Sequence, residues 1–270
     1  MSEEPNNIEL SIIFSVLNEE HTLAPITEQT VIAINNYRFI TNWEIIFVDD
    51  ASTDSSLQVM KDLEAKFPDL VRIMEHKTRQ GQKGCFMTGF ENARGWMSVV
   101  MDADMHVIPE ELPLVLDKAI GEGYEMVYTH SDRSRSTDRR TFISSTGNIF
   151  MKLIFNSPVR DAANKFTAVE TRFIRGVKLG MGDQRYLLPI CMRRGLSKVA
   201  DVPCVFGVRQ YGSSNYNKWK KMLIGVPQMI SLRIRLLMGE YDLPPVGPGV
   251  RPKMHTDQLE EHENAHPFLG

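Results

Sequence analysis

Short apolar segments that end in acidic residues constrain the fold of this chain more than any other feature. The segments are Ile8–Val16, Trp43–Val48 followed by Asp49-Asp50, and Ser98–Met101 followed by Asp102-Ala103-Asp104. Continuous apolar and β-branched runs of this length are typical of strands buried on both faces, as in parallel sheets. In open sheets of this kind, ligands bind beyond the carboxyl ends of the strands. The sequence therefore predicts a parallel sheet with Asp49, Asp50, Asp102 and Asp104 along one edge.

Helical patterns alternate with these strands. The predicted helices of the first half are Thr22–Asn36, Ser55–Lys66 and a helix ending at Arg94, and the further strands are Leu70–Met74 and Tyr124–Thr129. Strict alternation of strand and helix predicts an α/β protein with one right-handed parallel sheet. In the second half, the pattern predicts a helix over Gly182–Arg194 and a strand over Lys198–Val208.

Composition narrows the class of protein. The chain has 270 residues, 42% of them hydrophobic and 24% charged, which are values of a soluble globular protein with one α/β domain and extensions, or two small domains. A formal net charge of -3 gives no electrostatic case for nucleic-acid binding. The three cysteines form no C-x-x-C pair, so neither a disulfide framework nor a zinc site is expected. The acidic start and the absence of an apolar run of about twenty residues predict a cytoplasmic chain without a spanning helix.

The D-x-D motif carries the clearest chemistry. Asp102 and Asp104 stand at a strand end, where both carboxylates can reach one divalent cation and leave coordination positions open for phosphate oxygens. His106 could add an imidazole ligand or a contact to the substrate. The alternative is an ordinary acidic turn between a strand and a helix, and for an isolated D-x-D this alternative is the commoner one.

The second half adds basic segments. Ser131–Arg140 and Arg209–Tyr216 are basic loops, and arginines beside an acidic cleft are suited to neutralising phosphate. The Lys218–Met238 segment has a helical pattern, with an apolar stripe that comprises Leu223, Val226, Ile230, Ile234 and Leu237. Two interpretations of this helix stay open: it lies on a membrane surface, or it packs on the core of its own domain.

Four motifs in a fixed order give a combined signature: LNEE after the first strand, VDDASTD after the second, MDADMH at the D-x-D and RQYGSSNY in the last basic loop. In this order the sequence resembles the GT-A, family 2 inverting glycosyltransferases, and among them the polyprenyl-phosphate sugar transferases. The resemblance covers about Leu10 to Tyr216. It implies a GT-A (Rossmann-like) fold, with a mostly parallel sheet flanked by helices. The expected organisation is a transferase domain over 8–216, an amphipathic helical extension over 217–240 and a poorly ordered tail over 241–270.

The resemblance also implies roles for individual residues. Those expected to bind the base and ribose of the nucleotide are Glu19, Asp49 and Asp50. Those expected to hold the metal are Asp102, Asp104 and His106. His106 stands where related enzymes often have glutamine, and an imidazole ligand suits Mn²⁺ better than Mg²⁺. The positions that would contact phosphates or the acceptor are Arg133, Arg140, Ser144, Arg209 and Ser214. Asp161 matches an aspartate of the family, but the residues after it depart from the family pattern, which leaves the identity of the sugar open.

The activity implied is transfer of a sugar from a nucleotide-sugar donor to a polyprenyl phosphate, with Mg²⁺ or Mn²⁺ as cofactor. Asp104 and Arg133 would then be catalytic, while a hydroxyl acceptor would need a general base, for which Asp161 is the candidate. Two alternatives stay open: a transferase to a hydroxyl of a glycan or small acceptor, and a non-catalytic nucleotide-sugar-binding protein. A lipid acceptor would bring the chain to the cytoplasmic face of a membrane, alone or through a membrane anchor protein, and a homodimer is a further open alternative.

Overall fold

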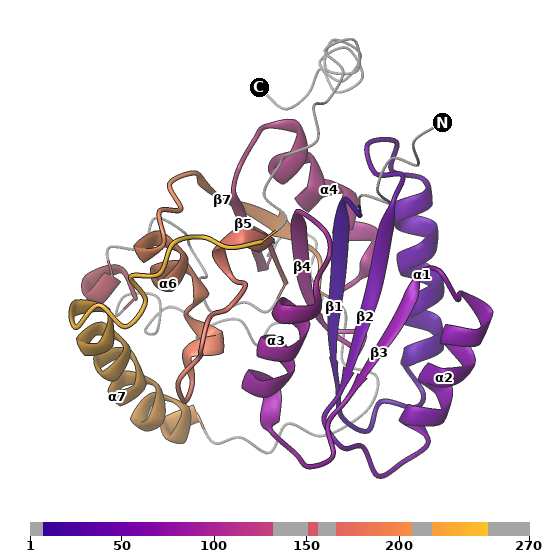
Figure 1. Ribbon diagram of the computed structural model, residues 1–270, viewed down its shortest axis with the longest axis horizontal. Helices are drawn as coiled ribbons and strands as arrows, with labels where there is room; N and C mark the ends of the chain where they lie inside the picture. The colour runs from indigo at the N-terminus through magenta and orange to yellow at the C-terminus, as the bar shows by residue number, and fades with distance from the viewer. Residues whose placement is uncertain (1–7, 132–150, 156–165, 207–217, 248–270) are drawn as a thin grey trace.

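The computed structural model describes residues 8–131, 151–155, 166–206 and 218–247 (Figure 1), and it describes the side chains of the last helix from Gly225 onward. The strands are β1 (Leu10–Val16), β2 (Trp43–Asp49), β3 (Val71–Glu75), β4 (Met97–Asp102), β5 (Met126–Ser131), β6 (Thr167–Glu170) and β7 (Val199–Cys204). The helices are α1 (Leu23–Asn35), α2 (Ser56–Lys66), α3 (Gly81–Asn92), α4 (Leu112–Leu116), α6 (Leu187–Arg193) and α7 (Lys218–Leu237). Short helical turns cover Pro109–Glu111, Asp117–Gly121, Thr171–Phe173 and Asp183–Arg185.

All described strands belong to one seven-stranded sheet of order β3-β2-β1-β4-β6-β5-β7. Strands β1 to β4 pair in parallel, and β7 pairs in parallel with β5. Strand β6 runs antiparallel between β4 and β5. The predicted α/β fold with a mostly parallel sheet is confirmed, and β6 of the second half is its one antiparallel strand among the described residues. Strand β6 was not predicted from the sequence. Its four residues give no clear strand pattern, and its pairing partners β4 and β5 are distant in the sequence.

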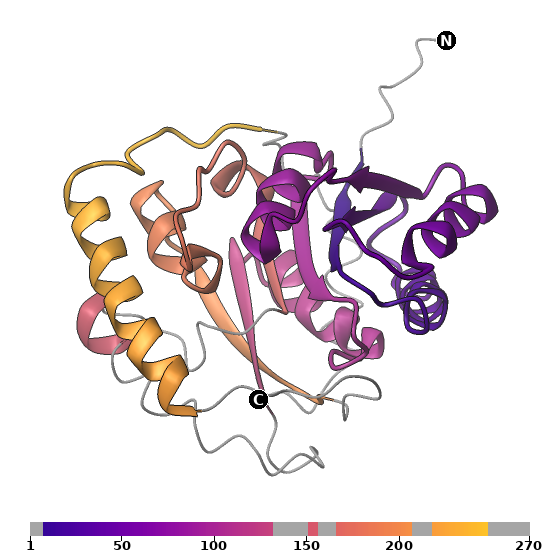
Figure 2. The same cartoon turned by 90° about the horizontal axis from the view of Figure 1, so that it is seen from below.

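Both faces of the parallel half are covered, which explains the unbroken apolar runs. Successive residues of a strand point to opposite faces. Phe14 and Phe47, whose ring centroids lie 5.4 Å apart, pack with α1, α2 and α4 on one face. Ile13 and Ile46 pack with α3 on the other face, where α6 and α7 continue the core (Figures 1 and 2). Burial on both faces therefore follows from the sequence pattern.

One charged side chain lies inside this apolar sheet. Glu44 of β2 is fully buried and accepts hydrogen bonds from the Ser11 hydroxyl at 2.7 Å and from the backbone N–H of Arg94 at 2.8 Å. The guanidinium groups of Arg72 and Arg94 donate to its other oxygen at 2.7 and 2.8 Å. Burial by itself would raise the pKa of Glu44, but these hydrogen bonds outweigh it and the pKa lies below the ordinary glutamate value.

Helix α7 docks on the domain through residues other than those of the stripe noted in the sequence. Met229, Leu232 and Leu236 are buried, whereas Ile230 and Ile234 are 49% and 52% exposed and Leu237 is 69% exposed. The helix therefore has two apolar stripes on opposite sides. The structure shows that the one noted from sequence faces outward at Ile230, Ile234 and Leu237. None of the helices in the described parts of the chain is both long and apolar enough to cross a membrane.

A buried carboxylate fixes the position of α7. Asp183, which is fully buried, accepts hydrogen bonds from both Nη atoms of Arg235 at 2.7 and 2.5 Å and from the Tyr241 hydroxyl at 2.6 Å. The backbone N–H of Gly180 donates to the same carboxylate at 2.6 Å. The paired carboxylate holds the Arg235 side chain against the domain.

Candidate functional site

The acidic clusters of β2 and β4 meet at one edge, because both strands flank β1. Asp49 is in register with Val16 of β1, and Asp102 is in register with Ser15. The carboxyl ends of these strands point downward in Figure 1, where α3 begins. The predicted gathering of carboxylates at the ligand-binding edge of the sheet is therefore present in the structure.

The D-x-D segment forms a tight turn beyond β4. Asp102 ends the strand, and its Oδ1 accepts a hydrogen bond from Gln82 Nε2 at 2.8 Å. Asp104 is 5% exposed, and its Oδ1 accepts the backbone N–H of His106 at 3.1 Å. Met105, which lies between Asp104 and His106, has a φ of 59°. This left-handed conformation is adopted by few non-glycine residues and is frequent at functional sites. The turn thus fixes the direction of the Asp104 carboxylate.

The segment after β7 contacts this turn. Phe206 pairs with Val107 in an isolated antiparallel bridge, and the Phe206 ring lies 5.4 Å from the His106 ring, centroid to centroid. Neither Gln82 nor Phe206 was identified from sequence. Gln82 is the second residue of α3, and no sequence pattern singled it out. Phe206 falls within the strand predicted over Lys198–Val208, and the sequence did not mark it as a site residue.

A second turn, beyond β2, is hydrogen-bonded to the loop after β1. Asp49 is buried and accepts the Ser52 hydroxyl at 2.5 Å. The Ser52 hydroxyl oxygen in turn accepts the backbone N–H of Asn18 at 3.1 Å, and Ser56 accepts the backbone N–H of Glu19 at 2.8 Å. The two loops after β1 and β2 are therefore tied to one another beside the D-x-D turn.

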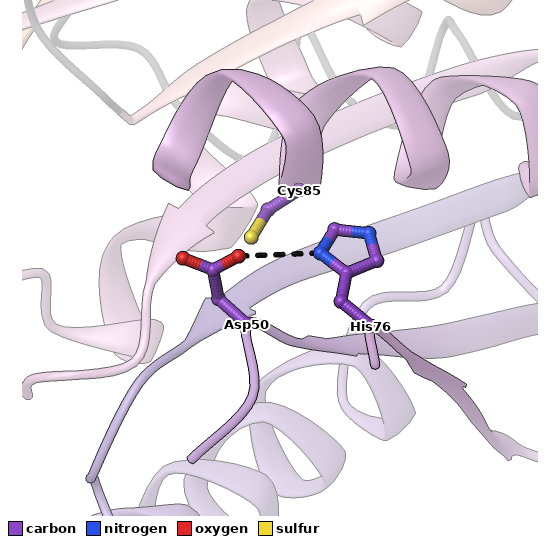
Figure 3. Close-up of side chains that lie close together, drawn as sticks. All are labelled: Asp50, His76 and Cys85. Carbon is purple, nitrogen blue, oxygen red and sulfur yellow. Dashed lines mark hydrogen bonds and ion pairs between the residues drawn. The ribbon is translucent and has the colours of Figure 1, made fainter. Parts of the chain in front are cut away.

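Asp50 lies in a different environment, in a buried cluster with His76 and Cys85 (Figure 3). His76 Nδ1 lies 3.2 Å from Asp50 Oδ1, and His76 Nε2 lies 2.9 Å from the Thr88 hydroxyl. The ligand atoms of Asp50, His76 and Cys85 all lie within 4.8 Å of one another, and no other group of three possible metal ligands is found among the described residues. This cluster joins β2, the end of β3 and α3.

We interpret the cluster as a hydrogen-bonded latch. Asp50 already accepts the backbone N–H groups of Gln80 at 2.7 Å and Gly81 at 2.9 Å, where the start of α3 carries partial positive charge. Burial, with the charges of Asp50 and Asp49, raises the pKa of the Cys85 thiol to about 12, so this thiol is neutral near pH 7. The latch fixes the start of α3, from which Gln82 reaches Asp102.

The donors of the D-x-D turn fit a divalent cation by their chemistry. Two carboxylates and an imidazole are ligands suited to Mn²⁺, and carboxylates alone suit Mg²⁺. The ligand atoms of Asp102, Asp104 and His106 do not gather within 4.8 Å of one another, so the turn offers an open set of donors rather than a closed cage. The remaining predicted site residues lie outside the described residues: Arg133, Arg140, Ser144, Asp161, Arg209 and Ser214.

This chain was compared with protein-family models, curated proteins and solved structures. The family model described as glycosyl transferase family 2 matches residues 11–178. A dolichol-phosphate mannosyltransferase of Pyrococcus furiosus is 28% identical over 214 residues, which cover 77% of this chain and 59% of the relative. An undecaprenyl-phosphate 4-deoxy-4-formamido-L-arabinose transferase of Pectobacterium carotovorum is 27% identical over 210 residues, covering 77% of this chain and 62% of the relative.

Solved structures match the fold. A mannosyltransferase from Pyrobaculum calidifontis, determined in complex with GDP-Man and Mn²⁺, superposes with a TM-score of 0.61 at 15% identity, covering 97% of this chain and 76% of that one. The chain spans about three-fifths of the length of the two curated relatives named above.

Proposed function

Because the chain belongs to glycosyl transferase family 2, we propose that it transfers a sugar, with inversion, from a nucleotide-sugar donor to a polyprenyl phosphate. The observation that carries the proposal is the D-x-D turn at the carboxyl edge of the sheet, with Asp104 held by the His106 backbone and Asp102 by Gln82. The choice of a lipid phosphate as acceptor is supported by the names of the two curated relatives.

The D-x-D turn would stabilise the diphosphate leaving group. Asp104, Asp102 and His106 are the residues that would hold Mg²⁺ or Mn²⁺, which when bound neutralises the charge that develops on the diphosphate. Glu19, Asp49 and Asp50 are proposed to line the nucleotide site. The buried contacts of Asp50 with Gln80 and Gly81 favour a role in shaping the loop before α3.

The acceptor determines which other residues are required. A phosphate oxygen is already anionic near neutral pH, so attack on the sugar needs no strong general base. It needs cations that hold two phosphates close together, and we propose that Arg133, Arg140 and Arg209 supply them. Ser144 and Ser214 would add hydrogen bonds. Asp161 would be required as a base only with a hydroxyl acceptor.

The first expected outcome is transfer that depends on a lipid phosphate. The purified protein is incubated with Mn²⁺ and radiolabelled GDP- or UDP-sugars, with undecaprenyl phosphate, with dolichyl phosphate, or with no lipid. We expect label in the organic phase only when a polyprenyl phosphate is present. Transfer solely to a water-soluble glycan would replace the lipid acceptor by a hydroxyl acceptor, and donor binding without any transfer would indicate the non-catalytic alternative.

Helix α7 provides a surface through which we propose the domain reaches the bilayer. Its outward stripe includes Ile230, Ile234 and Leu237, and a shallow depression beside it is lined by Pro227, Ile230, Ser231, Ile234 and Arg235. Figures 1 and 2 show α7 along the margin of the molecule opposite α1 and α2. In the sequence, Lys218, Lys220 and Lys221 begin the helix; their side chains lie outside the described residues. An apolar stripe with lysines is typical of an interfacial helix.

The double substitution Ile230→Glu/Ile234→Glu is expected to abolish binding to vesicles of phosphatidylglycerol and phosphatidylcholine. Loss of two half-exposed isoleucines removes about 2 kcal/mol of transfer free energy, or roughly 30-fold in partitioning, before the cost of inserting charge. The measurement is vesicle flotation at low and high salt, because each lysine near an anionic surface contributes about 1 kcal/mol that salt screens. Ile32→Glu is the matched control, since Ile32 is 61% exposed on α1. Equal flotation of the wild type, Ile230→Glu/Ile234→Glu and Ile32→Glu would contradict the proposal.

A further inference from the structure

Three residues with different ligand chemistry meet in the buried cluster of Figure 3. Asp50, His76 and Cys85 are 3%, 7% and 1% exposed, and their carboxylate, imidazole and thiol ligand atoms all lie within 4.8 Å of one another. Asp50 directly follows β2, His76 directly follows β3, and Cys85 lies in the second turn of α3. Because each ligand belongs to a different element, no C-x-x-C or similar spacing marks them as a group in the sequence.

The separations are close to those of a tetrahedral zinc site. His76 Nδ1 lies 3.2 Å from Asp50 Oδ1. Two ligand atoms that are each about 2.0 Å from a tetrahedral Zn²⁺ lie about 3.3 Å apart, so this pair is already at the required distance. A thiolate sulfur about 2.3 Å from the ion lies about 3.5 Å from the other two ligand atoms. Since all three atoms lie within 4.8 Å, Cys85 Sγ has to approach the other two by at most about 1.3 Å.

The surroundings of the cluster suit a bound cation. His76 Nε2 lies 2.9 Å from the Thr88 hydroxyl. A histidine that ligates a metal through one ring nitrogen is usually held by such a hydrogen bond at the other. Burial and the negative charges of Asp50 and Asp49 raise the pKa of the Cys85 thiol to about 12. The same charges attract a divalent cation, and coordination to a metal removes the thiol proton.

We propose that Asp50, His76 and Cys85 form a Zn²⁺ site, with water in the fourth position, that shares no ligand with the D-x-D turn. On binding, the Cys85 thiol gives its proton to solvent. His76 ligates through the Nδ1 lone pair, and its remaining proton on Nε2 is donated to the Thr88 hydroxyl. Thiolate and imidazole ligands favour Zn²⁺ and disfavour Mg²⁺. Such a site would exist whether or not the chain transfers sugars.

The segment that links His76 to α3 gives a cation access to the cluster. Residues 77–80 of this segment are exposed. Arg79 Nε lies 3.7 Å from Asp50 Oδ2, and the Arg79 side chain is 70% exposed, so it can turn into solvent when an ion arrives. The bound ion would replace the hydrogen bond between Asp50 and His76 by coordination bonds. It would thereby tie the start of α3 to the ends of β2 and β3.

Titration with Co²⁺ tests the site. Co²⁺ can replace Zn²⁺ in tetrahedral sites, and a thiolate ligand gives it a charge-transfer absorption band that carboxylate and imidazole ligands do not give. The full chain, kept reduced with a phosphine, is titrated with Co²⁺ without nucleotide, and Zn²⁺ is then added. We expect the band to saturate at one Co²⁺ per chain and to disappear when Zn²⁺ displaces the ion. Cys85→Ser should lose the band, and His76→Gln should lower the affinity for Zn²⁺ at least about tenfold.

Matched variants separate this site from other cysteines and from the D-x-D turn. Cys191→Ala removes another buried cysteine and should retain the band. Asp104→Asn should also retain it, because the D-x-D turn supplies no thiolate. Circular dichroism and melting temperatures show that each variant is folded before it is titrated, and His76→Gln tests the site a second time should Cys85→Ser not fold. A wild type without the thiolate band would overturn the proposal, as would a band that persists in Cys85→Ser or an affinity for Zn²⁺ that is unchanged in His76→Gln.

Discussion

Substitution of Asp104 by asparagine is expected to lower the rate of sugar transfer about 10³-fold, the loss typical when a principal stabilising group for developing charge is removed. Asparagine preserves the size of the side chain, and its amide oxygen can still accept the N–H of His106, so the turn should keep its shape. What is lost is the negative charge that would hold the cation. In calorimetric titrations with UDP or GDP, the dependence of binding on Mn²⁺ should disappear.

Asp62→Asn is the control for this substitution. Asp62 lies on α2, where its carboxylate accepts a hydrogen bond from Gln58 at the exposed surface. Its replacement should change neither transfer nor nucleotide binding. Retention of Mn²⁺-dependent affinity by Asp104→Asn would show that Asp104 does not hold the ion, and would move the candidate cation site away from the D-x-D turn.

The second large effect concerns stability. Glu44→Gln should lower the free energy of unfolding by about 3 kcal/mol, because removal of one partner of a buried ion pair costs about 3–5 kcal/mol. The lower value is expected since Arg72 and Arg94 both reach solvent. For a chain of this size the loss corresponds to a fall of about 6–12 °C in melting temperature, measured by calorimetry. Glu28→Gln removes a surface pair with Lys66 and should cost less than about 1 kcal/mol.

The same substitution should change the pH dependence of unfolding. The pKa of Glu44 in the folded protein lies below its ordinary value of 4.5. Ionised Glu44 therefore stabilises the fold above about pH 4.5, and this contribution is lost as the pH falls through the lowered pKa. Denaturant titrations between pH 7 and pH 3 should show a shallower acid decline for Glu44→Gln than for the wild type. Parallel declines would indicate that other carboxylates dominate acid unfolding.

Local sequence patterns were enough to predict the parallel half of the sheet. Strands β1, β2 and β4 are buried on both faces, so most of their residues are apolar, and the acids that follow β1 or end β2 and β4 stand at the strand ends. Because parallel strands present their carboxyl ends at one edge, the meeting of Asp49 and Asp102 follows from the order of strands and helices alone. Four motifs in that order also identified the family that the comparison confirmed.

Contacts between distant segments decided the rest. Helix α7 carries two apolar stripes, and the periodicity of the sequence cannot tell which one is buried. In the structure the buried stripe is Met229, Leu232 and Leu236. Its burial is accompanied by the ion pair of Arg235 with Asp183, which lies 52 residues earlier. Gln82 reaches Asp102 because the latch at Asp50 fixes the start of α3, and Phe206 reaches His106 through the bridge to Val107. The sequence by itself therefore determined the α/β sheet and the edge that bears its acids, because strand burial and strand ends leave local signals. Only the tertiary structure decided which side chains orient those acids and which face of α7 stays exposed, since these depend on pairings between residues far apart in the chain.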